Sequence, residues 1–187
     1  GAPTLWSTWL LAMLRGTVNS VPLRFTALGN ENALGFSISY DPKHLSFYRA
    51  TAFPGTTLTL NTTQLASGNI GFLLALPAGQ AFPVGDNTII TLEFLPLGND
   101  ATTTTHLAFN DKVVKCEASD ALANALPHFS LTDADITISG RAVANVSAAS
   151  YTGEKSANES IISAFGIELA MVTQTATALP LPLSLGG

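Results

Sequence analysis

Apolar residues occupy every second position of residues 33–40, separated by alanine, glycine and serine. Because successive side chains of a β-strand point to opposite sides of a sheet, this alternation predicts a strand with one apolar face and one small, polar face. Proline cannot donate to the strand ladder and aspartate favours turns, so the strand should end at Asp41-Pro42. The side chains expected to face a core are Leu34, Phe36, Ile38 and Tyr40.

The same period of two recurs along residues 1–139, in short segments separated by glycine, proline and asparagine turns. Pro22 predicts an edge position for its strand, since proline lacks the donor that a central strand uses. Residues 104–118 fit two strands or one bulged strand, and residues 121–125 fit a helical turn. The expected strands span residues 4–10, 17–27, 33–40, 44–52, 57–61, 69–76, 87–95, 104–109, 112–118, 129–131 and 136–138.

Two segments leave room for another interpretation. Residues 4–13 also fit a short helix, because Trp6, Leu10 and Met13 have a helical spacing. Near the end of this region, the apolar positions change from odd to even between residues 129–131 and 136–138, and a β-bulge at residues 132–134 would explain the change.

About nine short strands with no sustained helical period predict an all-β fold, in which two sheets enclose one core as a β-sandwich. The region is long enough to bury a core without disulfides. The residues predicted to fill this core are Phe25, Phe36, Ile38, Leu45, Phe72, Leu74, Leu92, Phe94 and Ile136.

Charge and hydropathy exclude two classes of partner. The formal net charge is −5 and charged residues make up 11% of the chain, about half the usual share. Without clustered lysine and arginine the chain is not expected to bind nucleic acid. The longest apolar run, residues 9–14, is far too short to span a bilayer, so no membrane insertion is expected. This composition is typical of secreted or surface β-proteins.

Cysteine and histidine offer no obvious chemistry. Cys116 is the only cysteine, which excludes an intrachain disulfide and a cysteine-based metal site. We expect it to be a small buried side chain on the strand over residues 112–118. His44, His106 and His128 are isolated in the sequence and lack the spacing of metal ligands.

The carboxylates also lack a catalytic pattern. Asp133 and Asp135 lie two positions apart, which places both on one face of a strand. A calcium site would need six to eight oxygen ligands, and the sequence does not supply the others. We therefore expect no enzyme activity, no bound metal and no cofactor.

Residues 3–139 resemble a cohesin-type module. The resemblance rests on residues 29–36, on Tyr40-Asp41-Pro42 followed by Leu45-Ser46-Phe47, on the strands over residues 68–76 and 87–95, and on residues 133–138. It implies a nine-stranded jelly-roll β-sandwich that is non-catalytic and extracellular. The best-known members bind dockerin modules through the flat face of strands 8, 3, 6 and 5, and related sandwiches bind polysaccharide.

Residues 140–187 have a different character. Residues 146–153, 160–170 and 179–187 resemble the opening of a bacterial Ig-like C-terminal module of unknown function. We expect this segment to be a linker and an incomplete fragment of that module. Its few apolar residues cannot enclose a core of their own, so we expect it to pack on the sandwich or to form a homodimer contact with a second copy.

Strand parity also identifies the solvent side of the predicted sheet. This side is small, neutral and nearly free of charge, with Leu73 as its one large apolar side chain. Protein interfaces concentrate their binding energy in a few such anchors. The predicted binding surface consists of Ser37, Ser39, Thr57, Thr59, Asn61, Asn69, Gly71, Leu73 and Ala75.

The same surface favours a protein partner over a glycan. A polysaccharide platform needs aromatic rings in a row, and this face has none. Trp6 and Trp9 are the only candidates for a sugar-stacking pair, and we expect them to pack within the protein instead. We therefore predict an extracellular binding or adhesion module with a dockerin-like protein partner. The alternatives are a carbohydrate-binding module linked to polysaccharide degradation and a structural spacer in a large surface protein.

Overall fold

The computed structural model describes residues 2–7, 10–98, 102–127, 129–139, 144–147 and 162–165. The chain divides into two compact units, residues 1–140 and 141–187. In the second unit, β13 (Ala144–Ser147) pairs antiparallel with β14 (Ile162–Phe165). The rest of that unit lies outside the described residues, so the Ig-like fragment and its homodimer contact stay predictions. No helix in the described part of the chain is long and apolar enough to cross a membrane.

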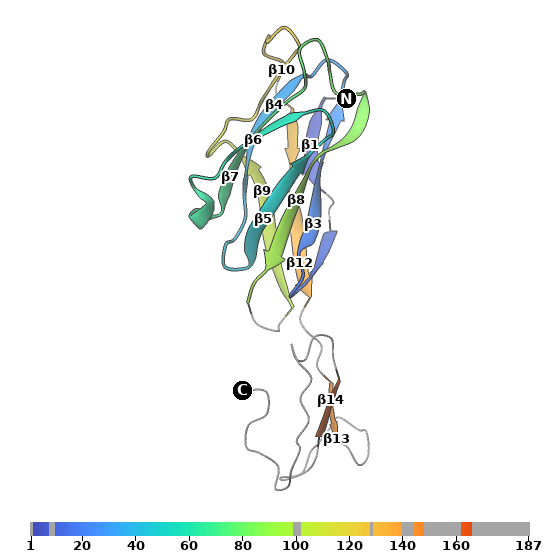
Figure 1. The fold of residues 1–187 in the computed structure, drawn as a ribbon, viewed down its shortest axis with the longest axis vertical. Helices are drawn as coiled ribbons and strands as arrows, with labels where there is room; N and C mark the ends of the chain where they lie inside the picture. The colour runs from blue at the N-terminus through green and yellow to red at the C-terminus, as the bar shows by residue number, and fades with distance from the viewer. Residues whose placement is uncertain are drawn as a thin grey trace. The chain divides into compact units, whose positions relative to one another are not determined.

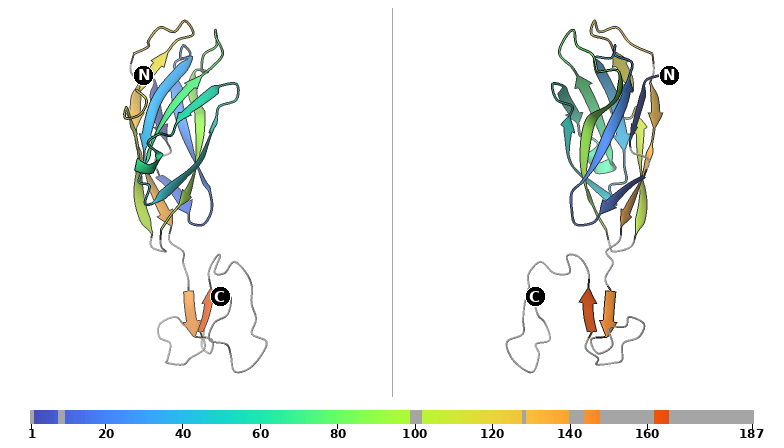
Figure 2. Two further views of the ribbon diagram at one scale, coloured as in Figure 1. Left: turned by 60° about the vertical axis from the view of Figure 1, so that its left-hand side comes forward. Right: turned by 90° about the vertical axis from the view of Figure 1, so that its right-hand side faces the viewer.

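The first unit is a sandwich of two β-sheets with the core between them (Figures 1 and 2). The five-stranded sheet has the order β11 (Ser130–Thr132), β1 (Thr4–Ser7), β3 (Asn19–Ala27), β8 (Gly85–Pro96) and β5 (Leu45–Ala52). The facing sheet has the order β2 (Leu10–Leu14), β12 (Ala134–Ser139), β9 (Thr103–Asn110), β4 (Ala33–Ser39), β7 (Asn69–Ala75) and β6 (Thr57–Asn61). The short β10 (Glu117–Ser119) pairs with the start of β4, and a 3-10 turn, Leu65–Ser67, precedes β7. The predicted all-β sandwich is confirmed.

The first and last strands of the sandwich each change sheets. β1 and β11 run parallel in the five-stranded sheet, and their continuations, β2 and β12, run parallel in the facing sheet. If each interrupted strand is counted once and β10 is left out, the sandwich has the nine strands that were expected. The change of parity before Ile136 arises because the chain crosses between sheets at Asp133, so the predicted bulge is wrong. The helical interpretation of residues 4–13 is also wrong.

Aromatic rings from the central strand β4 and its neighbours form the middle of the core. Phe36 stacks on Phe72 of β7, with ring centroids 5.1 Å apart, and meets Phe109 of β9 edge-on at 5.9 Å. On the five-stranded sheet, Phe25 of β3 makes edge contacts with Phe82 and Phe129. All nine residues predicted to fill the core are at most 1% exposed. The assignment of inward and outward faces from alternation is therefore confirmed for these strands.

Pro22 does not lie on an edge strand. Its strand, β3, pairs with β1 on one side and with β8 on the other. The described part of β1 ends at Ser7, opposite Leu23, so Pro22 lies beyond this pairing. The carbonyl of Pro22 accepts a hydrogen bond from Ser7 Oγ at 3.2 Å.

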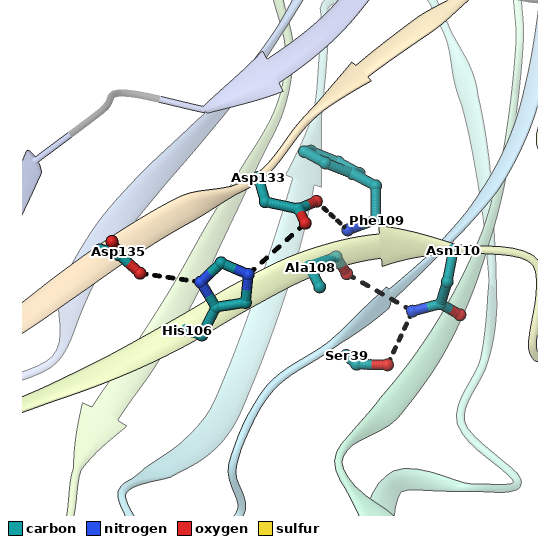
Figure 3. A network of polar contacts seen from close by, with 7 residues as sticks. All are labelled: Ser39, His106, Ala108, Phe109, Asn110, Asp133 and Asp135. Atoms are coloured by element: carbon teal, nitrogen blue, oxygen red, sulfur yellow. Dashed lines mark hydrogen bonds and ion pairs between the residues drawn. The ribbon is translucent and has the colours of Figure 1, made fainter.

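His106 of β9 links the crossing at Asp133 to β12 (Figure 3). Its Nδ1 lies 2.8 Å from Asp135 Oδ1, and its Nε2 lies 3.4 Å from Asp133 Oδ2. Asp133 also accepts a hydrogen bond from the backbone N–H of Phe109 at 2.8 Å, which connects the crossing segment to β9 where β12 has not yet begun. The prediction that His106 is isolated is wrong, because β-pairing brings together residues about thirty positions apart.

The two carboxylates favour the protonated imidazole. A neutral imidazole donates from one nitrogen only, whereas the imidazolium donates from both. The pKa of His106 is raised from its ordinary value of 6.5, chiefly by the hydrogen bond to Asp135, while partial burial acts in the opposite direction.

Phe36→Ala should lower the free energy of unfolding by about 3–5 kcal/mol, because it deletes a fully buried ring and leaves a cavity between two others. A domain typically has about 5–15 kcal/mol of stability in total, so the variant should be marginal. Urea unfolding of the full chain measures the change. Tyr48→Ala removes an exposed ring and serves as the control, with an expected change below about 0.5 kcal/mol. A melting temperature for Phe36→Ala close to that of the parent would mean that the faces of β4 are reversed.

Stability should also depend on the protonation of His106. A raised folded-state pKa stabilises the fold fully below the unfolded value of about 6.5, and this stabilisation is lost as the pH rises through the folded pKa. We expect a loss of a few tenths to about 1 kcal/mol, because the imidazole is largely exposed to solvent. Thermal melts across this pH range should show a smaller decline in stability for His106→Gln than for the parent. Equal slopes for the parent and His106→Gln would contradict the assignment.

Candidate functional site

The predicted binding surface lies on β4, β7 and β6. Leu73 is 49% exposed and lies between Thr59 of β6 and Gly35 of β4 in the pairing register. Thr57 and Thr59 are exposed, and three more of the predicted residues are partly exposed: Ser39, Asn61 and Ala75. These six residues face outward as expected.

The other three predicted residues are buried: Ser37, Asn69 and Gly71. Ser37 and Gly71 lie beneath residues 111–116, which we call the capping loop, whereas the side chain of Asn69 bonds Ser39 and Ser67. Ser37 Oγ accepts hydrogen bonds from the backbone N–H of Val113 at 3.1 Å and of Val114 at 2.7 Å, and it donates to Val114 O at 2.7 Å. The expectation that these three residues are open to solvent is therefore wrong.

Glycines allow the capping loop to lie against the sheet. A Cβ atom on Gly71 would lie 2.5 Å from Val114 Cγ2, and a Cβ on Gly35 would lie 2.9 Å from Lys115 O. Both distances are shorter than real Cβ contacts, so the loop packs directly on the backbone of β7 and β4. This packing replaces most of the strand expected over residues 112–118, of which only β10, Glu117–Ser119, forms. The loop amides bond a side chain instead of a strand.

A polar network fixes the base of the capping loop. Ser39 Oγ donates to Asn69 Oδ1 at 2.6 Å and accepts from Asn110 Nδ2 at 2.7 Å. Lys112 Nζ reaches the same oxygen at 3.3 Å. Figure 3 shows Asn110 turned toward Ser39 and toward the carbonyl of Ala108. Ser39 and Asn69 therefore hold the loop and have little hydrogen-bonding capacity left for a partner.

Cys116 lies at the end of the capping loop, not on a strand as expected, and it is half-buried. Burial raises the pKa of its thiol to about 12, and a hydrogen bond with Asp111 acts in the same direction. The thiol donates to the carbonyl of Asn110 at 3.2 Å. Because the thiolate is the nucleophilic form, this cysteine is unreactive at neutral pH.

A hollow of about 380 Å³ opens beside Leu73, between β4, β7, β10 and the segment that follows β10. The helical turn predicted for residues 121–125 does not form, so the far wall of this hollow is not predictable from that pattern. The structure instead has a turn that returns Ala125 to a bridge with Ser119. We call this the Leu73 hollow; its lining consists of Ala33, Gly35, Leu73, Glu117, Ala118, Ser119, Ala123, Ala125 and Leu126.

Asp120 organises the turn at the rim of the Leu73 hollow. Its Oδ1 accepts from the backbone N–H groups of Leu122 and Asn124, both at 2.9 Å, and its Oδ2 accepts from Asn124 Nδ2 at 2.9 Å. The hydrogen bond from the Asn124 side chain is the main reason that the pKa of Asp120 is lowered. This fixed turn presents Leu122, which is 83% exposed, and holds Ala123 at φ 63°. A non-glycine residue held in the left-handed region is a recurrent feature of functional sites.

Other candidate sites are less developed. In the part of the chain that the structure describes, no group of three or more histidine, cysteine, aspartate or glutamate side chains is placed to hold a metal ion. Asp133 and Asp135 are directed at His106. His44 Nδ1 lies 3.3 Å from Asp41 Oδ2 in the turn after β4. Trp9 and His128 lie outside the described residues.

No protein-family model and no curated protein matches the chain. Solved structures match its fold over about three quarters of its length, which corresponds to the proportion of the chain in the first unit. The seventh ScaB type I cohesin of Pseudobacteroides cellulosolvens has a TM-score of 0.62 at 16% identity, covering 75% of this chain and 94% of that one.

Two further structures agree. The Coh-OlpC–Doc435 cohesin–dockerin complex of Clostridium thermocellum has a TM-score of 0.61 at 12% identity, with 74% of this chain and 94% of that chain covered. A non-cellulosomal cohesin of Archaeoglobus fulgidus has a TM-score of 0.58 at 13% identity, with 74% and 91% covered. Together with the observed strand order and core, these matches show that the first unit of the chain is a cohesin-like β-sandwich.

Proposed function

We propose that the sandwich is a non-catalytic module that binds a dockerin-like protein through its docking face. The docking face is the outward side of β9, β4, β7 and β6 together with the capping loop and the Leu73 hollow. The observation that carries the proposal is the exposed Leu73 at the edge of this hollow. Several solved structures of the same fold are cohesin–dockerin complexes.

The chemistry of the docking face suits a protein partner. Leu73 offers an apolar anchor next to a hollow that can receive a side chain, and anchors in pockets carry most of the binding energy at protein interfaces. Leu122 adds a second exposed apolar side chain on the fixed turn of Asp120. The threonine hydroxyls of β6 surround the anchor with groups that donate and accept hydrogen bonds. This arrangement of apolar centre and polar rim is typical of protein interfaces.

The capping loop changes which groups a partner meets. Ser37 and Gly71 are covered, so the partner would contact the half-buried side chains of Val113 and Val114 instead. The loop is held by three hydrogen bonds to Ser37 before any partner arrives. A surface that is already ordered loses less conformational entropy on binding.

A polysaccharide platform is less well supported than a protein partner. In the described part of the chain, the docking face carries no tryptophan, tyrosine or phenylalanine on its outward side. Trp6 and Tyr48 belong to the other sheet, on β1 and β5, with β3 and β8 between them. Rings separated in this way do not form the continuous row that an extended glycan surface needs.

An extracellular location is part of the proposal. The chain has a low share of charged residues and many threonine and serine residues, as expected of a secreted or cell-surface β-protein. A structural spacer in a larger surface protein is the remaining alternative, and it would leave the docking face without any partner.

Leu73→Asp should abolish partner binding, because it places a charge at the centre of the apolar anchor site. The protein should stay folded, because Leu73 is an exposed side chain. The full chain and the variant are used in parallel to capture secreted proteins of the source, with insoluble polysaccharides as a separate arm. A protein that carries a dockerin module and is retained only by the parent is then purified, and its affinity for both chains is measured by calorimetry.

Thr51→Asp is the matched control, since it adds the same charge to an exposed position of β5 in the other sheet. It should bind the captured protein as the parent does. Equal capture by the parent and by Leu73→Asp would refute the proposed face. If the chain is retained by a polysaccharide and captures no protein, the alternative of a carbohydrate-binding module is favoured.

Ser37→Ala should release the capping loop, because it leaves the amides of Val113 and Val114 without their acceptor. We expect a loss of about 1–3 kcal/mol in stability and faster hydrogen exchange at these two amides. Partner affinity should fall as the loop becomes mobile. Ser46→Ala, at an exposed serine of β5, is the control and should change none of these quantities. Unchanged amide protection in Ser37→Ala would show that the loop does not depend on this side chain.

A further inference from the structure

A second hollow lies on the outer face of the opposite sheet. It measures about 320 Å³ and is lined by Thr4, Trp6, Thr26, Asp86 and Thr132, which come from four adjacent strands, β11, β1, β3 and β8. We propose that this Trp6 hollow binds a single neutral sugar unit, stacked on Trp6 and hydrogen-bonded to Asp86 and the threonine hydroxyls. The inference is independent of the docking face, because the two sites lie on different sheets.

The indole ring is held in place by a chain of hydrogen bonds. Trp6 Nε1 donates to Thr26 Oγ1 at 3.3 Å, and Thr26 Oγ1 in turn donates to Asp86 Oδ1. Thr26 lies opposite Thr4 on β1 and opposite Asp86 on β8, so the pairing register sets this arrangement. An aromatic ring with its polar edge fixed keeps its orientation before a ligand binds, which is what a stacking platform needs.

The hollow retains hydrogen-bonding capacity after these contacts. Asp86 is exposed and uses one carboxylate oxygen for Thr26, so the other oxygen can accept from a ligand hydroxyl. Thr4 donates to the carbonyl of Ala2 at 3.3 Å and can still accept. Thr132 has no side-chain partner within the described residues and can do both. A ligand with several hydroxyl groups on a ring with apolar C–H faces matches this set of groups.

The charges near the ring favour an uncharged ligand. The guanidinium group of Arg24 lies over the Trp6 ring, with its carbon 5.2 Å from the ring centroid, so a ligand can stack only on the other face of the indole. Arg24 Nε is buried without a hydrogen-bond acceptor among the described residues. A cationic ligand at Trp6 would be repelled by Arg24, and an anionic ligand would face the exposed carboxylate of Asp86. A neutral polyhydroxylated ring meets neither penalty and can offer oxygens to the arginine.

The size of the hollow limits the ligand to one unit. Its volume lies at the lower end of the range for small-molecule sites. It contains one aromatic ring, and Tyr48, the exposed ring of the same sheet, lies on β5 beyond β3 and β8. The structure therefore assigns this site to a single sugar unit, such as the end or a branch of a glycan, and not to an extended chain.

The indole N–H of Trp6 provides a direct measure of binding. The full chain, labelled with nitrogen-15, is titrated with glucose, galactose, mannose and N-acetylglucosamine, up to tens of millimolar. The chain has two tryptophans, so Trp9→Phe assigns the Trp6 signal. We expect a saturable shift of this signal with at least one neutral sugar, with a dissociation constant in the millimolar range. Glucuronate and arginine methyl ester test the anionic and cationic alternatives.

Asp86→Ala should weaken this binding at least tenfold. Glu93→Gln removes a carboxylate from the same outer face and should leave it unchanged, as should Leu73→Asp on the other sheet. If Asp86→Ala does not fold, Thr132→Val removes a hydroxyl without changing charge and should weaken binding several-fold. The inference is overturned if no neutral sugar gives a saturable shift, if only glucuronate or arginine methyl ester does, or if folded Asp86→Ala binds as the parent does.

Discussion

The stacking of Phe36 on Phe72 is the contact on which the rest of the sandwich depends. These two rings belong to the paired central strands β4 and β7 of their sheet, and Phe109 of β9 closes against Phe36 from the other side. Because a strand has a period of two, fixing these rings inward fixes every alternate position of the three strands outward. A slip of one residue would expose all three rings, so the packing of the core also determines which residues form the docking face.

The outward side of the same strands has the opposite requirement. It must leave space for the capping loop, and it does so through small residues at the positions that alternate with the rings. Gly35 and Gly71 flank Phe36 and Phe72 in the sequence, and a Cβ atom at either glycine would collide with the loop. Ser37 then supplies the hydrogen bonds that the loop backbone lacks. One stretch of β4 thus places large rings against the core and small residues against the loop.

Local alternation predicted the core but not the contacts between distant segments. All nine core residues could be assigned because the alternation of apolar and polar residues within one strand is enough to identify its buried face. The crossing at Asp133, the ion pairs of His106 and the burial of Ser37 could not be assigned, since each depends on a partner strand or loop that is far away in the sequence. Six of the nine predicted surface residues face outward for the same local reason, and the other three are buried by contacts that alternation does not encode. The far wall of the Leu73 hollow could not be predicted because residues 121–125, which form the turn after Asp120, have a composition that also fits a helical turn.

The docking face and the Trp6 hollow place two different kinds of recognition on the two sheets. The docking face carries exposed charged side chains on and beside the capping loop (Asp111, Lys112, Lys115 and Glu117), but its proposed anchor is a leucine, so binding there would gain free energy mainly by excluding water from the apolar centre. The Trp6 hollow combines one ring with a carboxylate and an arginine, so it gains selectivity from hydrogen bonds that a ligand must satisfy. The core lies between the two sheets, so the two proposed sites share no residue. On the two proposals together, a partner protein on one sheet and a sugar unit on the other would bind without competing, because the two sites lie on different sheets.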